Sequence, residues 1–523
     1  MSEAEENKSS HTPKIIADEK DPVFPMDKYN QTLMKNVHPC DWVNPEPAEK
    51  YNLVVIGAGP AGLVAAAGAA GMGAKVAIVE QHLMGGDCSN VGCVPSKCMI
   101  RSARAAADVR KAANFGVNVP EDVAVDFGFV MERMRRIRAQ ISENDSVERF
   151  TKMGVDVFLG QGRFVDDRTI EVAGKKLKFR KAVIATGARA VHPTNLEGAG
   201  ETGYLTNENV FNLTQLPPRM VVFGAGPIGC ELGQSFARFG SQVTILQSRN
   251  QFLPREDPDA AAIIQRGFES EGIKIVLNAR TYKMEKKNGE KIVYYRQDGK
   301  ECSVSCDEVL IGAGRQPNVE NINLETVSVE YDTRKGVKVD ETFQTTNSRI
   351  YAIGDVCSAY KFTHTADASA RILIQNALFL GHKKLTTTAI PWCTYTDPEV
   401  AHVGMYEQDA AAKGIEIDTF MQSLDEVDRA VTDGETQGMV KVHVKKGSDK
   451  ILGATIVARH AGEMINELTL AITNKIGLGK LSSVIHPYPT QADAIHKVAD
   501  AYNRTRLTPL AKSLSTKWLD VTR

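Results

Sequence analysis

The clearest pattern in the chain is a short hydrophobic run that leads into a glycine-rich segment, and it occurs twice. Residues 53–56 (LVVI) precede GAGPAGLVAAAGAAGMGAKVAIVE at 57–80, and residues 220–223 (MVVF) precede GAGPIGCELGQSFARFGSQVTILQ at 224–247. The two long segments align without a gap. Each follows one apolar run and ends in another, which predicts strand, turn, helix and strand. The sequence therefore predicts two copies of one βαβ unit.

Hydrophobicity elsewhere does not predict a membrane protein. Residues 53–74 are uncharged and long enough to span a bilayer, but they contain six glycines and begin with the strand-and-turn pattern. The N-terminus is polar and lacks the layout of a signal or transit peptide. We expect a cytoplasmic protein with an N-terminal extension over 1–50, flexible over 1–25 and extended on a neighbouring surface over 37–47.

The composition excludes several classes of protein. Hydrophobic residues make up 42% and charged residues 24% of the 523 residues, as in an ordinary globular protein. The 63 basic and 64 acidic side chains nearly cancel, so we expect no nucleic-acid and no membrane partner. Nine cysteines are too few, and odd in number, for a secreted fold held together by disulfides.

The three glycines of each copy suit a dinucleotide site. The first permits a tight turn, the second lets the backbone approach a pyrophosphate, and the third lets the helix pack closely on the strand. In chain order they are Gly57, Gly59 and Gly62, and then Gly224, Gly226 and Gly229. The helix N-terminus supplies N–H groups to the phosphates. Two such sites predict two cofactors that exchange electrons.

The residue that ends the second strand of each unit distinguishes the two nucleotides. Glu80 in the first copy can bind the ribose hydroxyls of an adenosine. The matching residue of the second copy is Gln247, which would not repel a 2′-phosphate, and Arg249 could pair with that phosphate. We therefore favour NADPH at the second site, with NADH possible.

Two cysteines follow the first unit in the segment GGDCSNVGCVPSK at 85–97. Cys88 and Cys93 are five residues apart, which in a regular helix is a rise of about 7.5 Å. The Cα atoms of a disulfide lie roughly 4.4–6.8 Å apart, so a bridge needs a distorted first helical turn, which Gly92 and Pro95 favour. Such a bridge in a cytosolic protein is usually catalytic. Two unrelated buried cysteines are the alternative.

These motifs resemble the class I pyridine nucleotide-disulfide oxidoreductase family of FAD flavoproteins, whose active-site signature is GGxCxNxGCxPSK. Further segments that match are VIATGARA (183–190), IGAGRQPN (311–318), IYAIGDV (350–356), TDPEVAHVG (396–404) and PTQAD (489–493). The resemblance runs from about residue 51 to 500. It is closest to the mercuric reductase-like branch, through Arg249, the run REDP at 255–258, and Tyr488.

The resemblance implies an α/β fold with two Rossmann-like dinucleotide-binding domains, an α+β dimerisation domain and a homodimer. The expected blocks after the N-terminal extension are an FAD-binding domain (51–190), an NAD(P)-binding domain (191–324), the second part of the FAD-binding domain (325–385), the dimerisation domain (386–500) and a C-terminal tail (501–523). Apolar residues near helical spacing favour docking of this mobile tail on a protein surface over membrane contact.

The resemblance also implies residue roles. Cys93 is the thiolate next to the flavin, and Cys88 is the thiol that attacks the substrate. Lys97 and Glu231 pair beside the flavin N5, with a purely structural ion pair as the alternative. The residues that it assigns to cofactor contacts besides the glycines are Glu80, Lys97, Thr186, Gly187, Glu231, Arg249, Gly312, Asp355, Thr363 and His364. Thr363 and His364 begin a helix aimed at the flavin ring.

The C-terminal motif departs from the family pattern. Members that reduce disulfides carry His-Pro-Thr-x-x-Glu, but this chain reads IHPYPTQAD, which places Tyr488 at the histidine position and Asp493 at the glutamate position. His486 lies two residues early. Tyrosine is a poor base at neutral pH because its pKa is about 10. Mercuric reductase also resembles this chain in having a tyrosine here, but its paired C-terminal cysteines are replaced by WLDVTR.

The favoured function is an FAD-dependent NADPH oxidoreductase that passes electrons through Cys88 and Cys93 to an acceptor, with a metal ion favoured over another small molecule. We expect no resident metal. One alternative is a dihydrolipoamide dehydrogenase-like or small-disulfide reductase in which His486 is the base and Asp493 orients it. The other is a redox-sensing flavoprotein with poor turnover.

Overall fold

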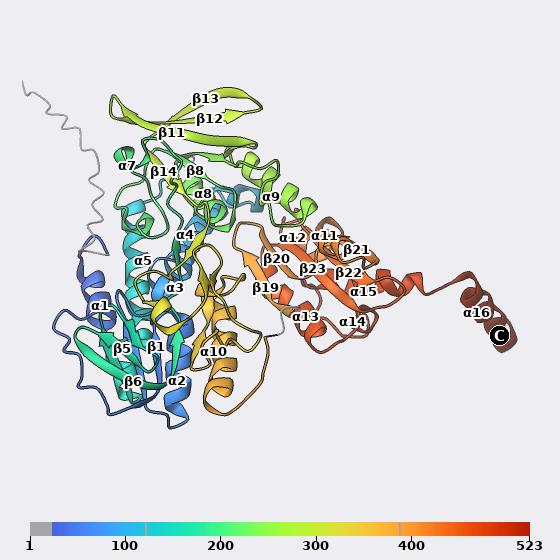
Figure 1. The fold of residues 1–523 in the computed structure, drawn as a ribbon. Coiled ribbons are helices and arrows are strands. Elements are labelled where there is room, and N and C mark those ends of the chain that lie inside the picture. The colour runs from blue at the N-terminus through green and yellow to red at the C-terminus, as the bar shows by residue number, and fades with distance from the viewer. Residues whose placement is uncertain (1–22, 121–122, 386–388) are drawn as a thin grey trace, which may run out of the picture.

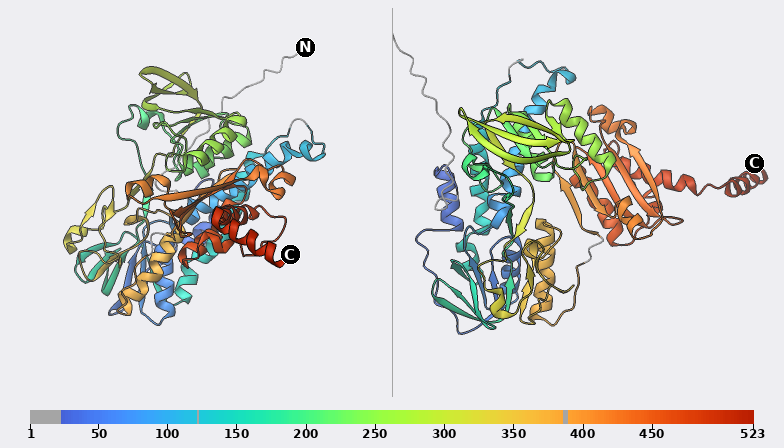
Figure 2. Two further views of the ribbon diagram at one scale, coloured as in Figure 1. Left: turned by 90° about the vertical axis from the view of Figure 1, so that its right-hand side faces the viewer. Right: turned by 45° about the horizontal axis from the view of Figure 1, so that its top comes forward.

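The computed structural model describes residues 23–120, 123–385 and 389–523 (Figure 1). The expected flexible tail over 1–25 thus falls almost wholly outside the described residues. Three structural units, each built on its own sheet, follow one another along most of the chain, and the last helix projects from the third unit (Figures 1 and 2).

The first unit contains the first predicted βαβ repeat. Its sheet has the order β3-β2-β1-β6-β5-β4, and β18 pairs with β6. The strands are β1 (Tyr51–Ile56), β2 (Val76–Glu80), β3 (Val155–Leu159), β4 (Arg163–Asp166), β5 (Thr169–Val172), β6 (Lys175–Ile184) and β18 (Ile350–Ala352). Helices α2 (Pro60–Gly71) and α10 (Thr363–Leu378) lie against each other beside this sheet. The uncharged run at 53–74 is thus divided between a strand and a helix.

The second unit contains the second repeat. Its parallel sheet has the order β10-β9-β8-β14 and carries a three-stranded antiparallel sheet, β11-β12-β13. The strands are β8 (Arg219–Phe223), β9 (Gln242–Leu246), β10 (Lys274–Val276), β11 (Ala279–Lys287), β12 (Glu290–Gln297), β13 (Lys300–Cys306) and β14 (Glu308–Ile311), and the helices are α7 (Ala199–Thr202), α8 (Pro227–Phe239) and α9 (Pro258–Ser270). Short strands β7 (Ala188–Ala190) and β15 (Arg315–Pro317) pair where the chain enters and leaves this unit.

The third unit is a five-stranded antiparallel sheet in the order β19-β20-β23-β22-β21. Its elements are β19 (Pro391–Thr394), β20 (Glu399–Gly404), α11 (Glu407–Ala412), β21 (Ile417–Ser423), α12 (Asp428–Thr432), β22 (Met439–Lys445), β23 (Ile451–Ala458), α13 (Ala461–Thr473), α14 (Leu478–Leu481) and α15 (Asp493–Thr505). The expected mobile tail is helical here, because α15 extends to Thr505 and α16 (Pro509–Thr522) follows it.

Among the described residues, four α-helices lie between β2 and β3 along the chain, and the first two of them contain the cysteines. They are α3 (Gly86–Asn90), α4 (Cys93–Arg110), α5 (Phe127–Ser142) and α6 (Val147–Lys152), with the short strands β16 (Tyr331–Asp332) and β17 (Gly336–Val337) later in the chain. Helix α1 (Lys28–Val37) was not expected from the polar 1–50 segment. It packs on α5, burying Leu33 and Val37, and Asp27 accepts hydrogen bonds at its N-terminus.

The proline-containing stretch after α1 lies along β3. The Trp42 indole N–H donates to the Val157 carbonyl at 3.3 Å, and Asn44 exchanges two hydrogen bonds with the backbone of Leu159. The N-terminal extension is therefore attached to the first unit from Val23 onward, where the structure describes it. Within the described residues, no helix is long and apolar enough to cross a membrane.

Candidate active site

The two cysteines lie on either side of a break between two helices. Cys88 is in α3 and Cys93 begins α4. At the break, a Cβ added to Gly92 would lie 2.8 Å from the Asp87 carbonyl oxygen, so only glycine fits there without a shift. The expected distortion is present, and Gly92 makes it possible. Neither cysteine is in a disulfide here, so the structure shows the pair in its reduced form, and the two side chains are hydrogen-bonded to each other.

The neighbours of the two sulfurs shift their pKa values in opposite directions. The hydrogen bond from Cys88 lowers the pKa of Cys93 to about 6, the Lys97 cation and Thr363 add to this, and burial opposes it. The same hydrogen bond, together with burial, holds the pKa of Cys88 far above its usual range. At neutral pH the pair is therefore a Cys93 thiolate beside a Cys88 thiol, which suits the roles that the family resemblance implies.

Lys97 and Glu231 form an ion pair between helices of two different units. Lys97 Nζ lies 2.8 Å from Glu231 Oε2, and the Lys97 ammonium sits 4.6 Å from the centre of the Tyr395 ring. The other Glu231 oxygen accepts the Tyr395 N–H at 2.9 Å. Burial disfavours the Lys97 cation, but Glu231 outweighs it and raises the pKa of Lys97. Tyr395 was missed because it directly precedes the segment that matches the family.

The turn between β1 and α2 has the shape of a nucleotide cradle. A Cβ on Gly57 would lie 2.3 Å from the Ala185 carbonyl oxygen, and one on Gly62 would lie 1.9 Å from the Gly57 carbonyl oxygen. At Gly59 the nearest atom is 3.8 Å away, which leaves room beside the backbone. The three glycines therefore allow a tight turn, a close approach of a pyrophosphate to the backbone, and close packing of α2 on the strand, as FAD binding needs.

Glu80 lies at the end of β2, where an adenosine ribose would be held. Its two carboxylate oxygens accept the N–H groups of Ala58 at 2.6 Å and His82 at 2.8 Å. Burial raises the pKa of Glu80, and these backbone donors oppose that rise. Thr186 and Gly187 follow β6, next to this turn; the Thr186 hydroxyl donates to the Asn318 carbonyl at 2.6 Å, and Gly187 has φ of 70°.

Asp355, Thr363 and His364 come from the segment that returns to the first sheet. Asp355 lies 3.9 Å from Arg315, which also contacts Asp87. Burial raises the pKa of Asp355 and Arg315 opposes this rise. Arg315 lies within a segment that matches the family, but sequence reasoning did not single it out.

Helix α10 begins at Thr363, as expected. Thr363 Oγ1 is 3.7 Å from the Cys93 sulfur, which places the start of this helix beside the thiolate. The neighbouring His364 does not face the cysteines. Its Nε2 is 2.7 Å from the Pro391 carbonyl oxygen, and its ring stacks on Phe362 with 5.3 Å between the centres.

The second cradle repeats the first. A Cβ on Gly224 would lie 3.1 Å from the Gly312 carbonyl oxygen, and one on Gly229 would lie 2.1 Å from the Gly224 carbonyl oxygen, while Gly226 has open space. Gln247 is buried and Arg249 is exposed. Within the part of the chain that the structure describes, Arg249 has no carboxylate partner, so its guanidinium is free to meet an anion.

The C-terminal residues do not form the arrangement expected for a histidine base. His486 Nε2 lies 3.0 Å from Glu467 Oε1, and its Nδ1 lies 3.0 Å from the Val484 carbonyl oxygen. Asp493 does not pair with His486 in this arrangement, since its carboxylate lies 3.8 Å from Nδ1 of His496; a role for Asp493 in orienting a released His486 stays a prediction. Glu467 was missed because α13 comes close to this loop only in the folded chain.

Tyr488 is the C-terminal candidate that faces solvent. It is 74% exposed, and its hydroxyl donates to Asp428 Oδ2 at 2.8 Å. No sequence signal connects Asp428, 60 residues earlier, with Tyr488. Among the described residues, no hydrogen bond or ion pair joins Tyr488, His486 or Asp493 to the cysteine pair of the same subunit.

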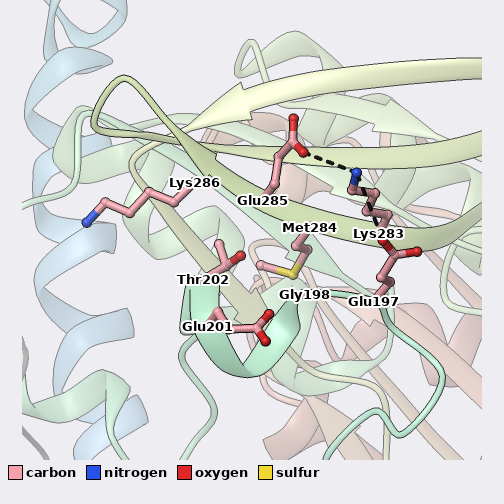
Figure 3. Close-up of a pocket in the computed structure, with 8 residues that line it drawn as sticks. All are labelled: Glu197, Gly198, Glu201, Thr202, Lys283, Met284, Glu285 and Lys286. Carbon is pink, nitrogen blue, oxygen red and sulfur yellow. Dashed lines mark ion pairs between the residues drawn. The ribbon is translucent and has the colours of Figure 1, made fainter.

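A separate open pocket of about 480 Å³ lies between α7 and β11 of the second unit (Figure 3). Its lining residues are Glu197, Gly198, Glu201, Thr202, Lys283, Met284, Glu285 and Lys286. Lys283 lies 3.1 Å from Glu285 and 4.0 Å from Glu197, so neighbouring charges partly balance. The structure finds no cluster of three or more His, Cys, Asp or Glu side chains suited to a metal among the described residues.

Two nucleotide cradles around a thiolate–thiol pair define a pyridine nucleotide-dependent flavoprotein that uses a dithiol. The chain belongs to the pyridine nucleotide-disulphide oxidoreductase family, whose model matches residues 51–370; residues 390–499 match the dimerisation domain of that family. It is therefore an FAD-dependent oxidoreductase that takes electrons from NAD(P)H.

The chain is similar to relatives with two different names. A mercuric reductase of Staphylococcus aureus is 33% identical over 454 residues, covering 87% of this chain and 83% of the relative. A dihydrolipoyl dehydrogenase of Geobacillus stearothermophilus is 32% identical over 453 residues, covering 86% and 95%. Among solved structures, the Cu(II) complex of the HOCl-induced flavoprotein disulfide reductase RclA from Escherichia coli has a TM-score of 0.77, with 27% identity, and covers 87% of this chain and 100% of RclA.

Proposed function

We propose that the chain is a homodimeric, NADPH-dependent reductase that passes electrons through Cys88 and Cys93 to a thiophilic metal ion, Hg²⁺ or Cu²⁺. Mercuric reductases at 33% identity and the Cu(II) complex of RclA support an acceptor of this class. The match of residues 390–499 to a dimerisation domain supports the homodimer. The open environment of Arg249 beside a buried Gln247 supports NADPH.

The surroundings of His486 and Tyr488 favour a metal ion over a disulfide as the acceptor. Both ring nitrogens of His486 face acceptor oxygens, and its side chain is 8% exposed, so this histidine is not free to serve a leaving thiol. Tyr488 is the group that remains open. A disulfide substrate benefits from a base that protects the attacking thiolate and protonates the leaving one. A soft metal ion needs no such proton transfer, because thiolates bind it directly.

The cysteine pair can bind the metal ion and then reduce it. Bound FAD supplies the electron relay between NADPH and the cysteines. The Cys93 thiolate binds the metal ion, Cys88 releases its proton and becomes the second ligand, and the proton leaves to solvent. Oxidation of this dithiolate to the disulfide yields two electrons, which reduce one Hg²⁺ to Hg⁰ or two Cu²⁺ to two Cu⁺. Tyr488 of the partner subunit, held by Asp428, would face the metal as an oxygen ligand or hydrogen-bond donor.

Acceptor assays on matched variants test this proposal. Purified enzyme receives NADPH and, in separate reactions, Hg²⁺, Cu²⁺, lipoamide or glutathione disulfide. We expect fast turnover with a metal ion, loss of that turnover in Cys88→Ser, a clear decrease in Tyr488→Phe, and little change in His486→Ala. Strong lipoamide or glutathione disulfide reduction that His486→Ala abolishes and Tyr488→Phe spares would contradict it.

The second candidate is a small-disulfide reductase. Its support is the His486–Glu467 pair, since a histidine with a carboxylate partner is a common general base, together with dihydrolipoyl dehydrogenase relatives at 32% identity. This function requires the 484–490 loop to release His486 from Glu467. Glu467→Gln should then lower lipoamide turnover strongly, whereas in the metal reductase it should leave metal turnover unchanged.

A further inference from the structure

The C-terminal helix α16 shows a hydrophobic face that its own subunit does not cover. Leu510, Leu514, Trp518 and Val521 recur at intervals of three and four residues, which places them on one side of a helix. They are 70%, 59%, 68% and 83% exposed. Large apolar side chains gathered on one exposed face usually mark an interaction surface.

The helix is well formed but isolated. Thr508 caps its N-terminus by accepting the Ala511 N–H at 3.2 Å, and Pro509 occupies the first turn. None of its residues is buried. Within the described chain, no hydrogen bond or ion pair connects it to the body of the subunit. Because helices of this length are marginal alone in water, a surface outside the subunit is needed to hold it.

The position of α16 indicates which surface that is. It continues from α15, the last helix of the unit that matches the family's dimerisation domain, and that match ends at residue 499. Figures 1 and 2 show that α16 projects from this unit on the side away from the first two sheets. The chain that this family match leads us to expect beside the unit is a second subunit, so a second subunit is the occupant that we consider for the free face of α16.

Other large apolar side chains of the same unit are also exposed. Leu470 on α13 is 60% exposed and Ile485, beside Tyr488, is 96% exposed. Glu467, one turn before Leu470, contacts His486 directly after Ile485, which places both side chains in one region. The unit that matches the dimerisation domain thus exposes apolar side chains on its body as well as on α16.

We infer that α16 is an arm that crosses to the second copy of this chain and packs its Leu510–Leu514–Trp518–Val521 face on the partner. This inference rests on the proposed homodimer. The polar side of the helix, with Lys512, Thr516 and Asp520, remains in solvent. The arm adds buried apolar area to the dimer interface and leaves the cysteine site unchanged.

Sedimentation velocity over a dilution series tests the arm. The samples are the full chain, a chain that ends at Arg506, the triple variant Leu510→Ser/Leu514→Ser/Trp518→Ser, and the control Ser513→Ala/Thr516→Ala on the polar side. Loss of several buried apolar anchors should raise the dimer dissociation constant by at least about tenfold in the first two variants. The control should match the full chain. Circular dichroism and bound FAD verify that each variant is folded.

The outcomes separate the arm from the homodimer itself. Dissociation constants of the truncated and triple variants equal to that of the full chain overturn the arm while the homodimer stands. A full chain that is monomeric at every concentration overturns both.

Two further measurements exclude other occupants. Iodide should quench Trp518 fluorescence, taken as the difference from Trp518→Phe, only after dilution into monomers; quenching that is equal in the dimer overturns the arm. The protein should not co-sediment with vesicles of phosphatidylcholine that contain 30% phosphatidylserine. If the full chain co-sediments with these vesicles and the triple variant does not, α16 binds a membrane surface instead.

Discussion

The charge on the Cys93 sulfur depends on groups from three helices. Cys88 in α3 donates a hydrogen bond, Lys97 in α4 supplies a positive charge, and Thr363 at the start of α10 adds a second polar contact. Burial of the sulfur opposes all three. A thiolate that is stable at neutral pH beside a protonated partner is the reactive form for metal binding and for exchange with disulfides.

Removing the Cys88 donor should raise the pKa of Cys93. The pKa of Cys93 is lowered to about 6, so its thiolate exists above that pH and is lost as the pH falls through it. In the reduced wild-type enzyme, the thiolate absorbance and the long-wavelength thiolate-to-flavin band should titrate with a midpoint near 6. Cys88→Ala should move the midpoint upward, whereas Cys98→Ala, a buried thiol of the same region, should not. An unchanged midpoint in Cys88→Ala would contradict this assignment.

Arg249 should determine the preference for the nucleotide. Because Gln247 brings no negative charge and Arg249 is exposed next to it, kcat/KM should be higher for NADPH than for NADH. Arg249→Glu should lower or reverse this ratio by repelling the 2′-phosphate. Lys274→Glu, an equal change of charge at an exposed position of β10 in the same sheet, should leave it unchanged. A wild-type preference for NADH counts against the proposed role of Arg249.

At the scale of elements, the sequence patterns predicted the helices and strands that depend on nearby residues. Both βαβ repeats form as expected, because alternating strand and helix periods and a glycine turn suffice to specify them. Helix α1 was not predicted because its sequence is polar. It is stabilised by packing against α5, where Arg135 donates to Asp27 and Arg138 donates to Asn30. The pairs Tyr488–Asp428 and His486–Glu467 join elements distant in sequence. Neither periodicity nor motif spacing encodes such tertiary contacts.

Helix α2 provides a test of the cradle with a control in the same helix. At Gly62 a Cβ would lie 1.9 Å from the Gly57 carbonyl oxygen, so Gly62→Ala must push α2 away from β1. We expect most bound FAD to be lost and stability to fall by about 1–3 kcal/mol, the usual cost of overpacking. Gly71→Ala, with open space around its Cβ, should keep both. The ratio of flavin to protein absorbance and thermal unfolding measure the two effects; retention of FAD by Gly62→Ala would contradict the cradle.

At the scale of the whole molecule, the cysteine site lies where the three units meet. The Lys97–Glu231 pair joins α4 to α8, and the Tyr395 backbone of the third unit donates to the same glutamate. Arg238 of α8 pairs with Asp397 at 2.9 Å, and Lys441 of β22 pairs with Asp257 at 2.8 Å, both largely buried. The third unit is thus fixed against the second, and a partner that docks on it would be placed relative to the thiols.

This geometry predicts that one complete site needs two subunits. Tyr488 makes no hydrogen bond to Cys88 or Cys93 among the described residues of its own subunit, yet it is exposed on the third unit. We therefore expect Tyr488 to serve the cysteines of the partner. Cys88→Ser and Tyr488→Phe homodimers should each reduce the metal ion poorly, because the first lacks a metal-binding thiol and the second lacks the tyrosine hydroxyl.

Mixed dimers of these two variants separate the arrangements. If Tyr488 acts across the interface, a mixed dimer has one site with Cys88 from the Tyr488→Phe subunit and Tyr488 from the Cys88→Ser subunit, and that site is complete. Random mixing makes half of the dimers mixed, each with one complete site of two, so activity should rise to about a quarter of the wild-type value. If Tyr488 acted within its own subunit, no mixed dimer would contain a complete site and mixing would restore nothing. A Cys93→Ser subunit mixed with Cys88→Ser is the control, because both cysteines come from one chain and that mixture should stay inactive in either arrangement.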